Sequence, residues 1–467
     1  MTRKITLTVT ADTLAANLPA NVVSLLKQQL TLPNPKYQDA KKYGRWIGKK
    51  IKPNLSFYKE RQAGLHFPRG FTRQAIYHIR RCTPDCELDI QDHRQIMADT
   101  DVTFQGSLRP YQQEAITAIT AHEFGVIESG TGSGKTIIAL KTIAERRQPT
   151  LVLVHTKELL YQWLDQIEKF LGLKAGLIGD GHFEIAELTV AIVNSARNRL
   201  DELPQHFGHL VVDECHRVPA SLFTDVVTAF DCRYMLGLSA TAFRRDGLTR
   251  LIYFYLGDRS HRVDPAALHS SGAVLQPEYI QRPTEFSYVY RGNYQHLMKA
   301  LARNRQRNEL IAEDVIREVG REKGTVLVVS DRVTHCEELA AIIARKSGHT
   351  LQPAVLTGKL ASEERTAIIE AVRRGETEIL VSTLQLIGEG FDCPGLRALF
   401  LTTPIKFTGR LLQVVGRILR PAAGKKPRVY DYIDPVGVLK ASARARHKTL
   451  ILPTLGNSDA EPLPIRE

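Results

Sequence analysis

The sequence predicts an α/β protein with two parallel-sheet domains, preceded by a small basic α+β domain at the N-terminus. Two observations favour this fold class. From about Gly125 onward, short runs of β-branched and other apolar residues alternate with helical segments, and the runs are apolar on both faces, which is typical of a parallel sheet covered by helices on both sides. The excess positive charge is gathered before residue 82, which separates the N-terminal part from the rest.

Three domains are expected in the 467 residues, with bounds 1–105, 106–285 and 286–467. The first set of predicted strands contains FGVIES, TLVLVHT, LTVAIVNS, HLVVDECH and YMLGLSAT, and the second contains TVLVVSD, EILVST, ALFLTTP and VYDYID. A polar stretch from about 258 to 323 separates the two sets and is expected to contain few strands.

The N-terminal domain carries the charge of the whole chain. Residues 1–81 contain sixteen Lys and Arg and three Asp and Glu, an excess of thirteen that equals the formal charge of the full sequence. Residues 36–53 combine seven basic side chains with three aromatic rings, which suits phosphate contacts and base stacking. We predict a nucleic-acid-binding module whose phosphate contacts include Lys41, Lys42, Arg45, Lys49 and Lys50. A solvated basic face, or a contact with an acidic protein, is the alternative.

Composition excludes several classes of protein. The first residues lack the apolar core of a secretory signal, and no run of about 18 apolar residues occurs. The six cysteines are scattered, so no disulfide framework is expected, and we predict a soluble intracellular protein, cytoplasmic and associated with the nucleoid. His78, Cys82, Cys86 and His93 are the right residue types for zinc. Their spacing is loose, and burial of Cys86 as a small apolar residue beside a strand is favoured.

A glycine-rich turn lies between a predicted buried strand and a helix in FGVIESGTGSGKTIIALKTI. Backbone amides in such a loop point at phosphate oxygens, and the helix N-terminus adds favourable potential. The loop residues predicted to bind the nucleotide are Gly130, Thr131, Gly132, Ser133 and Gly134. Lys135 would bridge the β- and γ-phosphates, and Thr136 would bind magnesium. Ser129 stands where the strict pattern has glycine.

Two adjacent carboxylates follow another buried strand, in HLVVDECHR. Asp213 is placed to hold magnesium through water, and Glu214 to activate the water that attacks the γ-phosphate. With the upstream phosphate loop, they predict a site that hydrolyses a nucleotide bound with Mg²⁺.

These residues resemble the DEAD/DEAH-type box of the superfamily 2 helicases, whose other motifs follow in order over about two thirds of the chain. The resemblance implies two RecA-like domains that form an ATP cleft, with Arg109 stacking on adenine and Gln112 bonding its edge. It also implies that Thr156, Lys157 and Trp163 track the nucleic-acid strand. Ser239, Ala240 and Thr241 would couple hydrolysis to movement, in contact with His216.

The second domain resembles the same superfamily. In QVVGRILRP, the residues Gln413, Arg417 and Arg420 recur at helical spacing, which places the two guanidinium groups on nearly one face. The resemblance implies that they meet phosphate across the cleft, where arginine stabilises developing charge. By the same resemblance, Gly390 and Asp392 lie near the ribose, and Arg332, Thr357 and Thr383 contact the DNA strand.

LSATAFRRDG and the N-terminal blocks NPKYQDAKKYGRW and FPRGF resemble the XPB-like and phage recombination-helicase branch. Arg245 replaces the central acid of that branch's Arg-Glu-Asp triplet. The resemblance implies an ATP-dependent DNA helicase that moves 3′ to 5′ on duplex, forked or branched DNA in repair or recombination. The alternatives are a duplex translocase in a nuclease or defence complex, an RNA helicase, and a nucleic-acid-binding protein gated by nucleotide.

Overall fold

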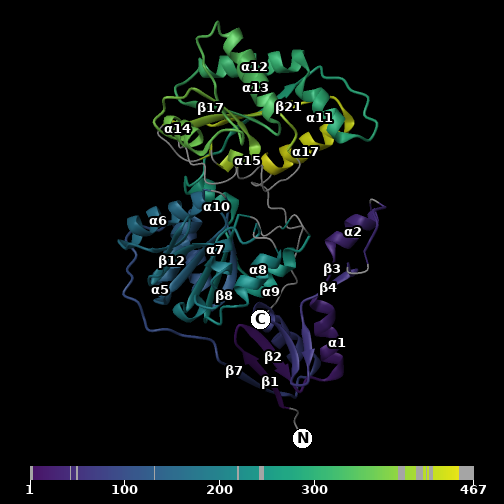
Figure 1. The fold of residues 1–467 in the computed structure, drawn as a ribbon, viewed down its shortest axis with the longest axis vertical. Coiled ribbons are helices and arrows are strands. Elements are labelled where there is room, and N and C mark those ends of the chain that lie inside the picture. The colour runs from purple at the N-terminus through teal and green to yellow at the C-terminus, as the bar shows by residue number, and fades with distance from the viewer. Residues whose placement is uncertain are drawn as a thin grey trace. The chain divides into compact units, whose positions relative to one another are not determined.

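The computed structural model describes residues 4–42, 44–48, 51–130, 132–217, 220–240, 244, 247–387, 395–405, 414–416, 418–419 and 424–451. The chain divides into two compact units, Met1–Ser129 with Gly134–Val263, and Gly130–Ser133 with Asp264–Glu467. The first unit contains a five-stranded and an eight-stranded sheet, and the second contains a six-stranded sheet (Figure 1). The predicted fold class, two parallel-sheet domains after a small α+β domain, is confirmed.

The N-terminal α+β domain has a sheet of order β5-β6-β2-β1-β7, antiparallel except for the β1–β7 pair. Its strands are β1 (Lys4–Val9), β2 (Asp12–Ala16), β5 (Lys59–Arg61), β6 (Gly64–Pro68) and β7 (Glu87–Asp92). Helices α1 (Ala20–Gln29) and α3 (Thr72–Cys82) accompany the sheet, and the short helix η1 (Arg69–Phe71) leads into α3. The core of this domain contains Ile5, Leu7, Val22, Leu26 and Ile79, all fully buried.

A small ribbon extends from this domain. Strands β3 (Thr31–Pro33) and β4 (Asn54–Ser56) pair antiparallel, and helix α2 (Pro35–Lys42) lies between them in the sequence. We refer to residues 34–53 as the arm. Figure 1 shows α2 beyond the β3–β4 ribbon, at the end away from α1.

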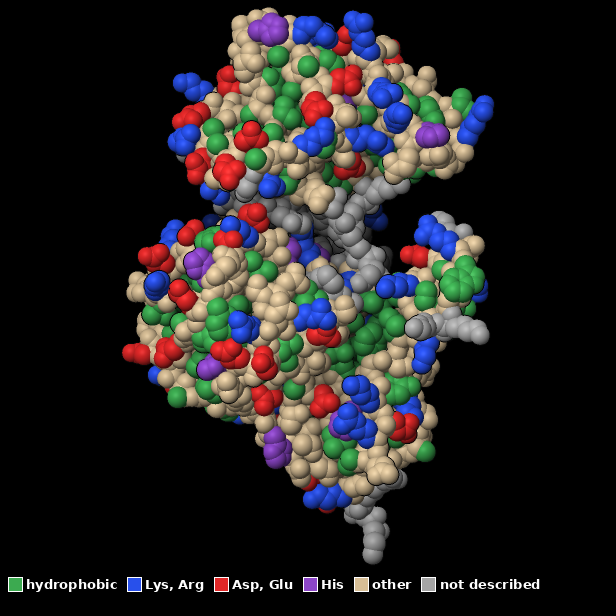
Figure 2. Space-filling view, viewed as in Figure 1, with side chains coloured by type: hydrophobic (Ala, Val, Ile, Leu, Met, Phe, Trp, Pro, Cys, Tyr) green, Lys and Arg blue, Asp and Glu red, His purple; other side chains and the backbone are tan. Residues whose placement is uncertain are grey.

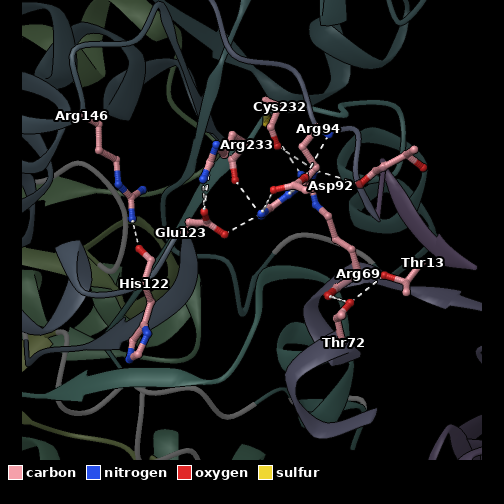
Figure 3. A network of polar contacts seen from close by, with 11 residues as sticks. Thr13, Arg69, Thr72, Asp92, Arg94, His122, Glu123, Arg146, Cys232 and Arg233 are labelled. Atoms are coloured by element: carbon pink, nitrogen blue, oxygen red, sulfur yellow. Dashed lines mark hydrogen bonds and ion pairs between the residues drawn. The ribbon is translucent and has the colours of Figure 1, made fainter. Parts of the chain in front are cut away.

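The segment FPRGF attaches the N-terminal domain to the first parallel domain (Figure 3). Arg69 is 2 % exposed, and its guanidinium donates to the carbonyl oxygen of Cys232 at 2.7 Å. Phe71 meets Phe254 edge-on, with ring centroids 5.6 Å apart. A Cβ atom on Gly70 would lie 2.4 Å from the backbone nitrogen of Gly257. The two domains are therefore packed backbone to backbone within one unit.

A second polar cluster joins the same two domains (Figure 3). Arg94 follows strand β7 and forms ion pairs with Asp92 at 2.7 Å and with Glu123 at 2.5 Å. Arg233 reaches the other oxygen of Glu123 at 2.7 Å. Because Arg94 is largely buried and keeps both carboxylate partners, the burial of its charge is compensated.

The eight-stranded sheet has the order β11-β10-β12-β9-β13-β14-β8-β15, parallel except for β11. Its strands are β8 (Phe124–Glu128), β9 (Thr150–Val154), β10 (Gly176–Gly179), β11 (His182–Glu184), β12 (Leu188–Ile192), β13 (His209–Val212), β14 (Tyr234–Ser239) and β15 (Arg259–Arg262). The accompanying helices are α4 (Pro110–Thr120), α5 (Lys135–Arg146), α6 (Lys157–Leu171), α7 (Val193–Arg197), η2 (Pro204–His206), α8 (Ala220–Val227) and α9 (Thr249–Leu256). Strands β9 and β13 are buried along their whole length, as the uninterrupted apolar runs predicted.

The second unit contains a fully parallel sheet of order β16-β21-β20-β17-β19-β18. Its strands are β16 (Glu278–Pro283), β17 (Thr325–Ser330), β18 (Ala354–Leu356), β19 (Ile379–Thr383), β20 (Leu396–Leu401) and β21 (Arg428–Ile433). Its helices include α10 (Pro265–Ser270), α11 (Tyr294–Ala302), α12 (Arg305–Val319), α13 (Val333–Lys346), α14 (Ser362–Arg373), α15 (Leu384–Ile387) and α17 (Gly437–Ile451). Within the described residues, every helix is too short or too polar to cross a lipid bilayer.

The predicted boundary at residues 285 and 286 is wrong. The two units separate between Val263 and Asp264, and β16 pairs with β21 in the second sheet. The stretch 258–323, expected to contain few strands, holds both β15 and β16. Both are edge strands with half-exposed, polar sequences, so they lack the apolar signature on which the prediction relied.

Candidate ATP-binding and hydrolysis site

The predicted motifs of the first unit gather at one edge of the eight-stranded sheet. Strands β9, β13, β14 and β8 are neighbours and run parallel, so their carboxyl ends meet at the same edge. Thr156 follows β9, Asp213 follows β13, and Ser239 ends β14. The phosphate loop follows β8 and leads into α5. The order of strands thus brings together motifs that are far apart in the sequence.

Glycine shapes the phosphate loop. Gly132 and Gly134 have positive φ angles of 87° and 76°, which glycine adopts without strain. A Cβ atom on Gly134 would lie 2.6 Å from the Nε2 atom of Gln112, so a side chain here would also push the end of Gln112 aside. The chain then enters α5 at Lys135, and the N-terminus of that helix favours an anion.

Lys135 joins the loop to the carboxylate pair. Its ammonium donates to the carbonyl oxygen of Ser129 at 3.2 Å and lies 3.7 Å from the Oε1 atom of Glu214. The Glu214 backbone has a φ angle of +44°, an uncommon conformation for a residue with a side chain. The structure therefore brings Lys135 and Glu214 together, although they lie far apart in the sequence.

The two carboxylates differ in their surroundings. Burial and the neighbouring charge of Glu214 raise the pKa of Asp213. Burial is the largest single influence and acts to raise the pKa of Glu214, but Lys135 and the other basic side chains around it together outweigh burial and hold that pKa below its usual range. The buried Oε2 atom of Glu214 makes no hydrogen bond within the described residues. An ionised carboxylate with one oxygen uncommitted is suited to accept a proton from a bound water.

Trp163 has a different place from the one predicted. Its side chain is 1 % exposed, which does not support its predicted contact with the nucleic-acid strand. The indole N–H instead donates to the Oδ2 atom of Asp213 at 2.9 Å. The Oδ1 atom of Asp213 accepts from the backbone N–H of Glu214 at 2.8 Å. Trp163 and this backbone amide together fix the orientation of the Asp213 carboxylate.

His216 links the carboxylates to the end of β14. Its Nδ1 atom shares a hydrogen bond of 2.8 Å with the Ser239 hydroxyl and lies 3.3 Å from the Oε2 atom of Glu214. The predicted contact between His216 and this motif is confirmed. Burial lowers the pKa of His216 to about 4, so the imidazole is neutral near pH 7. Ala240 follows Ser239 and is partly buried.

The predicted adenine-binding residues lie at the start of α4. Arg109 is exposed, and Gln112 is 3 % exposed. The Oε1 atom of Gln112 accepts from the backbone N–H of Arg109 at 2.9 Å, which caps the helix. The Nε2 atom faces the phosphate loop at Gly134. Contact of these two side chains with a base remains a prediction.

Five other predicted strand-contacting residues have mixed surroundings. Thr156 caps α6 by accepting from the backbone N–H of Leu159, and Lys157 is exposed and pairs with Asp180 at 2.7 Å. In the second unit, Arg332 and Thr383 are partly buried at strand ends. Thr357 is 3 % exposed, which does not support its predicted contact with DNA.

Several predicted residues fall outside the described part of the chain. They are Lys49, Lys50, Thr131, Thr241, Gly390, Asp392, Gln413, Arg417 and Arg420. Their roles stay predictions. Lys41, Lys42 and Arg45 are described and exposed on the arm.

The zinc alternative finds no support. Among the described residues, no group of three or more His, Cys, Asp or Glu side chains is arranged to hold a metal ion. Cys82 and Cys86 are free thiols that pack against the core of the first unit.

Sequence reasoning missed two positioning contacts. The Trp163–Asp213 hydrogen bond joins residues 50 positions apart, and the Arg69–Cys232 bond joins residues 163 positions apart. No local pattern indicates either pairing, because each depends on which helices and turns pack against which strand end.

Comparison with known proteins places the chain in a family. Residues 105–244 match the family described as type III restriction enzyme, res subunit, and residues 308–422 match the helicase conserved C-terminal domain. A protein of Sulfurisphaera tokodaii named DNA 3′-5′ translocase XPB2 is 27 % identical over 352 residues, covering 67 % of this chain and 78 % of that protein. The probable helicase D10 of Escherichia phage T5 is 27 % identical over 327 residues, covering 68 % and 70 %.

A solved structure shares the fold. A fragment of a putative HsdR subunit of a type I restriction enzyme from Vibrio vulnificus YJ016 matches with a TM-score of 0.57 and 20 % identity, over 74 % of this chain and 66 % of that chain. This likeness shows a shared fold, and the family is identified by the two domain matches and the sequence relatives. By its two domain matches the chain belongs to the superfamily 2 helicases, and its sequence is similar to those of their XPB-like branch.

Proposed function

We propose that the protein is an ATP-dependent DNA helicase or translocase that moves 3′ to 5′ on duplex, forked or branched DNA, in repair or recombination. The observation that carries the proposal is the contact between Lys135 and Glu214. It lies beside Asp213, whose carboxylate accepts a hydrogen bond from Trp163. Relatives named as a DNA 3′-5′ translocase and as a helicase support the substrate and the direction.

The described residues fit a magnesium nucleotide. Gly132 and Gly134 give the loop the positive φ angles of a phosphate cradle, and Glu214 keeps a buried oxygen without a hydrogen bond. Thr136 and Asp213 would hold the metal, which spreads the negative charge of the phosphates when bound. Lys135 would offset charge on the phosphates, and Glu214 would take the proton from the attacking water. His216 lies near Glu214 and shares a hydrogen bond with Ser239, so it would transmit a change in the protonation of Glu214 to the end of β14.

The roles of the second domain are part of the same proposal. Gln413, Arg417 and Arg420 would complete the hydrolysis site, with Gly390 and Asp392 near the ribose. Nucleotide-dependent movement of two such domains would shift their strand-binding residues along DNA.

Steady-state ATPase is the direct test of this function. Hydrolysis should be strongly stimulated by duplex or four-way-junction DNA, and Lys135→Ala should remove the activity by weakening phosphate charge compensation. Matched single-stranded DNA and duplex RNA complete the comparison. Stimulation by RNA alone would contradict the assignment of DNA as substrate. An ATPase rate that no nucleic acid changes would contradict the proposal that the protein is a nucleic-acid motor.

The match of residues 105–244 to a restriction-enzyme subunit favours a second candidate, a duplex translocase that does not separate strands. The two activities are distinguished by substrate. Release of a strand from forked DNA would establish a helicase. Displacement of a triplex-forming strand without opening of the duplex would establish the translocase.

Charge reversal on the arm tests its DNA contacts. Lys41→Glu with Lys42→Glu should weaken binding to DNA and reduce the slope of log affinity against log salt by about two to four, because each lost phosphate contact releases about one counterion fewer and the new acids add repulsion. Fluorescence anisotropy across a salt series measures this. Lys323→Glu with Lys346→Glu, at two exposed positions of the second unit, is the charge-matched control. An unchanged slope in the double variant would contradict the assignment.

Removing the indole N–H tests Trp163 as a positioning residue. The hydrogen bond from Trp163 lowers the pKa of Asp213, so Trp163→Phe should raise that pKa and move the acidic limb of the kcat–pH profile to higher pH. More Mg²⁺ should also be needed for half-maximal hydrolysis. Tyr161→Phe, an exposed position on the same helix, is the control. An unshifted profile with lower kcat would indicate that Trp163 acts through packing alone.

A further inference from the structure

Helix α2 has no buried residue, although it is ordered as a helix of eight residues. Packing of an apolar face therefore does not explain why α2 is helical. Isolated helices of this length are also marginally stable in water. Local contacts hold it instead. Asn34 caps its start, because the Oδ1 atom accepts from the backbone N–H of Lys36 at 3.1 Å. The same side chain donates to the carbonyl oxygen of Lys52 at 2.7 Å, which closes the base of the arm.

The end of α2 is equally specific. Gly44 has a φ angle of +59°, and the backbone N–H of Arg45 donates to the carbonyl oxygen of Ala40 at 2.8 Å. The N–H of Gly44 donates to the carbonyl oxygen of Lys41 at 3.3 Å. These two bonds form a Schellman motif, which turns the chain sharply after the helix. Trp46 is the first residue after this turn.

Trp46 is 88 % exposed, the highest value among the large hydrophobic side chains in the described residues. A Cβ atom on Gly48 would lie 3.1 Å from the Cζ3 atom of Trp46, so the indole ring rests across the Gly48 backbone. Other rings of this region are used in packing: Phe57 meets Phe254 at 5.6 Å, and Tyr58 lies under the ammonium of Lys27. Trp46 thus has surroundings different from those of these two nearby rings.

The surroundings of Trp46 are basic. The described residues of the arm include Lys36, Lys41, Lys42, Arg45 and Lys52, all exposed, and one acid, Asp39. On this arm, Figure 2 shows Lys and Arg side chains beside an exposed hydrophobic one. Cations that neutralise phosphates around a ring that can stack on bases form the arrangement used to bind single-stranded nucleic acid.

We propose that Trp46 is a stacking site for an unpaired base, and that the arm therefore selects DNA with exposed base faces, such as forks and junctions, over continuous duplex. This inference rests on the proposed function and names the substrate class of its N-terminal module. In duplex DNA each base face is covered by its neighbours, so an indole can stack there only after costly unstacking. At a fork or a single strand, the face is already open.

The two tryptophans of the chain make the proposal directly measurable. Trp163 is 1 % exposed, so fluorescence that acrylamide can quench comes from Trp46. Saturating single-stranded or forked DNA should quench this emission and lower its acrylamide accessibility several-fold, whereas a blunt duplex should do so much less. Trp46→Phe should remove the DNA-sensitive signal and identify its source.

Affinity provides the second readout. Trp46→Ala should weaken binding to forked DNA by about five- to 100-fold, the usual effect of losing one base–aromatic stack. Trp46→Phe should largely restore that affinity, and the salt dependence should not change, because the ring carries no charge. Binding to blunt duplex should stay close to that of the unmodified chain.

Three outcomes would overturn the proposal: full acrylamide accessibility of Trp46 at saturating forked DNA, equal loss of fork and duplex affinity in Trp46→Ala, or protection by anionic lipid vesicles but not by DNA. DNA-stimulated ATP hydrolysis by the unmodified chain is measured on the same DNAs. Stimulation without protection of Trp46 would refute the stacking site and leave the motor standing. Absence of stimulation would count against the proposed function itself.

Discussion

Replacing Glu214 with Gln is expected to lower kcat for DNA-stimulated ATP hydrolysis by about 100-fold or more, the usual contribution of a positioned general base. The amide keeps the size of the side chain but has no basic oxygen with which to accept a proton. In the native protein, Lys135 lies 3.7 Å from Oε1 and helps to keep the carboxylate ionised, while Oε2 is left without a hydrogen bond. Binding of ATP should persist, because the glycine loop and Lys135 remain.

The measurement is kcat and KM for ATP at saturating DNA, with binding of a fluorescent ATP analogue measured in parallel. Glu184→Gln, an exposed position on edge strand β11, makes the same chemical change away from the site. Should Glu214→Gln retain kcat within about threefold, another group must take the proton and the role given to Glu214 is wrong. Loss of analogue binding together with kcat would instead indicate a role in holding the nucleotide.

Replacing Gly70 with Ala is expected to destabilise the first unit by about 1–3 kcal/mol. The added Cβ would lie 2.4 Å from the nitrogen of Gly257 and 2.7 Å from the carbonyl oxygens of Phe254 and Tyr253. All three atoms are backbone, so no flexible side chain can move aside, and the end of α9 or the η1 turn must shift. The displacement would also disturb the Arg69 bond to Cys232 next to it.

Thermal unfolding followed by circular dichroism tests this, with an expected fall in Tm of roughly 2–12 °C. Gly437→Ala is the matched control, because a Cβ on the first residue of α17 meets nothing within 4 Å. That variant should unfold at or slightly above the native temperature. An unchanged Tm for Gly70→Ala would show that the N-terminal domain and the first parallel domain are packed less tightly than these distances require.

The fold class and most of the candidate hydrolysis site were predictable because their signals are local. Uninterrupted apolar runs such as those of β9 and β13 indicate strands buried on both faces, and parallel strands place their carboxyl ends at one edge. That rule alone brings a residue after β13 towards the loop after β8, and Glu214 does lie beside Lys135. The predicted contact of His216 with the Ser239 motif was confirmed for the same reason.

The tertiary structure decided what depends on distant partners. Strand β16 is a polar edge strand that became recognisable through its pairing with β21, 150 residues further on, so the boundary between the units was misplaced. Trp163 donates a hydrogen bond to Asp213 because α6 packs its indole against the end of β13. Trp46 is exposed because the Asn34 cap and the turn at Gly44 fix the path of the arm, whereas Phe57 packs against Phe254. Composition and periodicity determine which residues tend to be buried or charged, whereas the partner of each buried or exposed group is decided by packing between segments far apart in the chain.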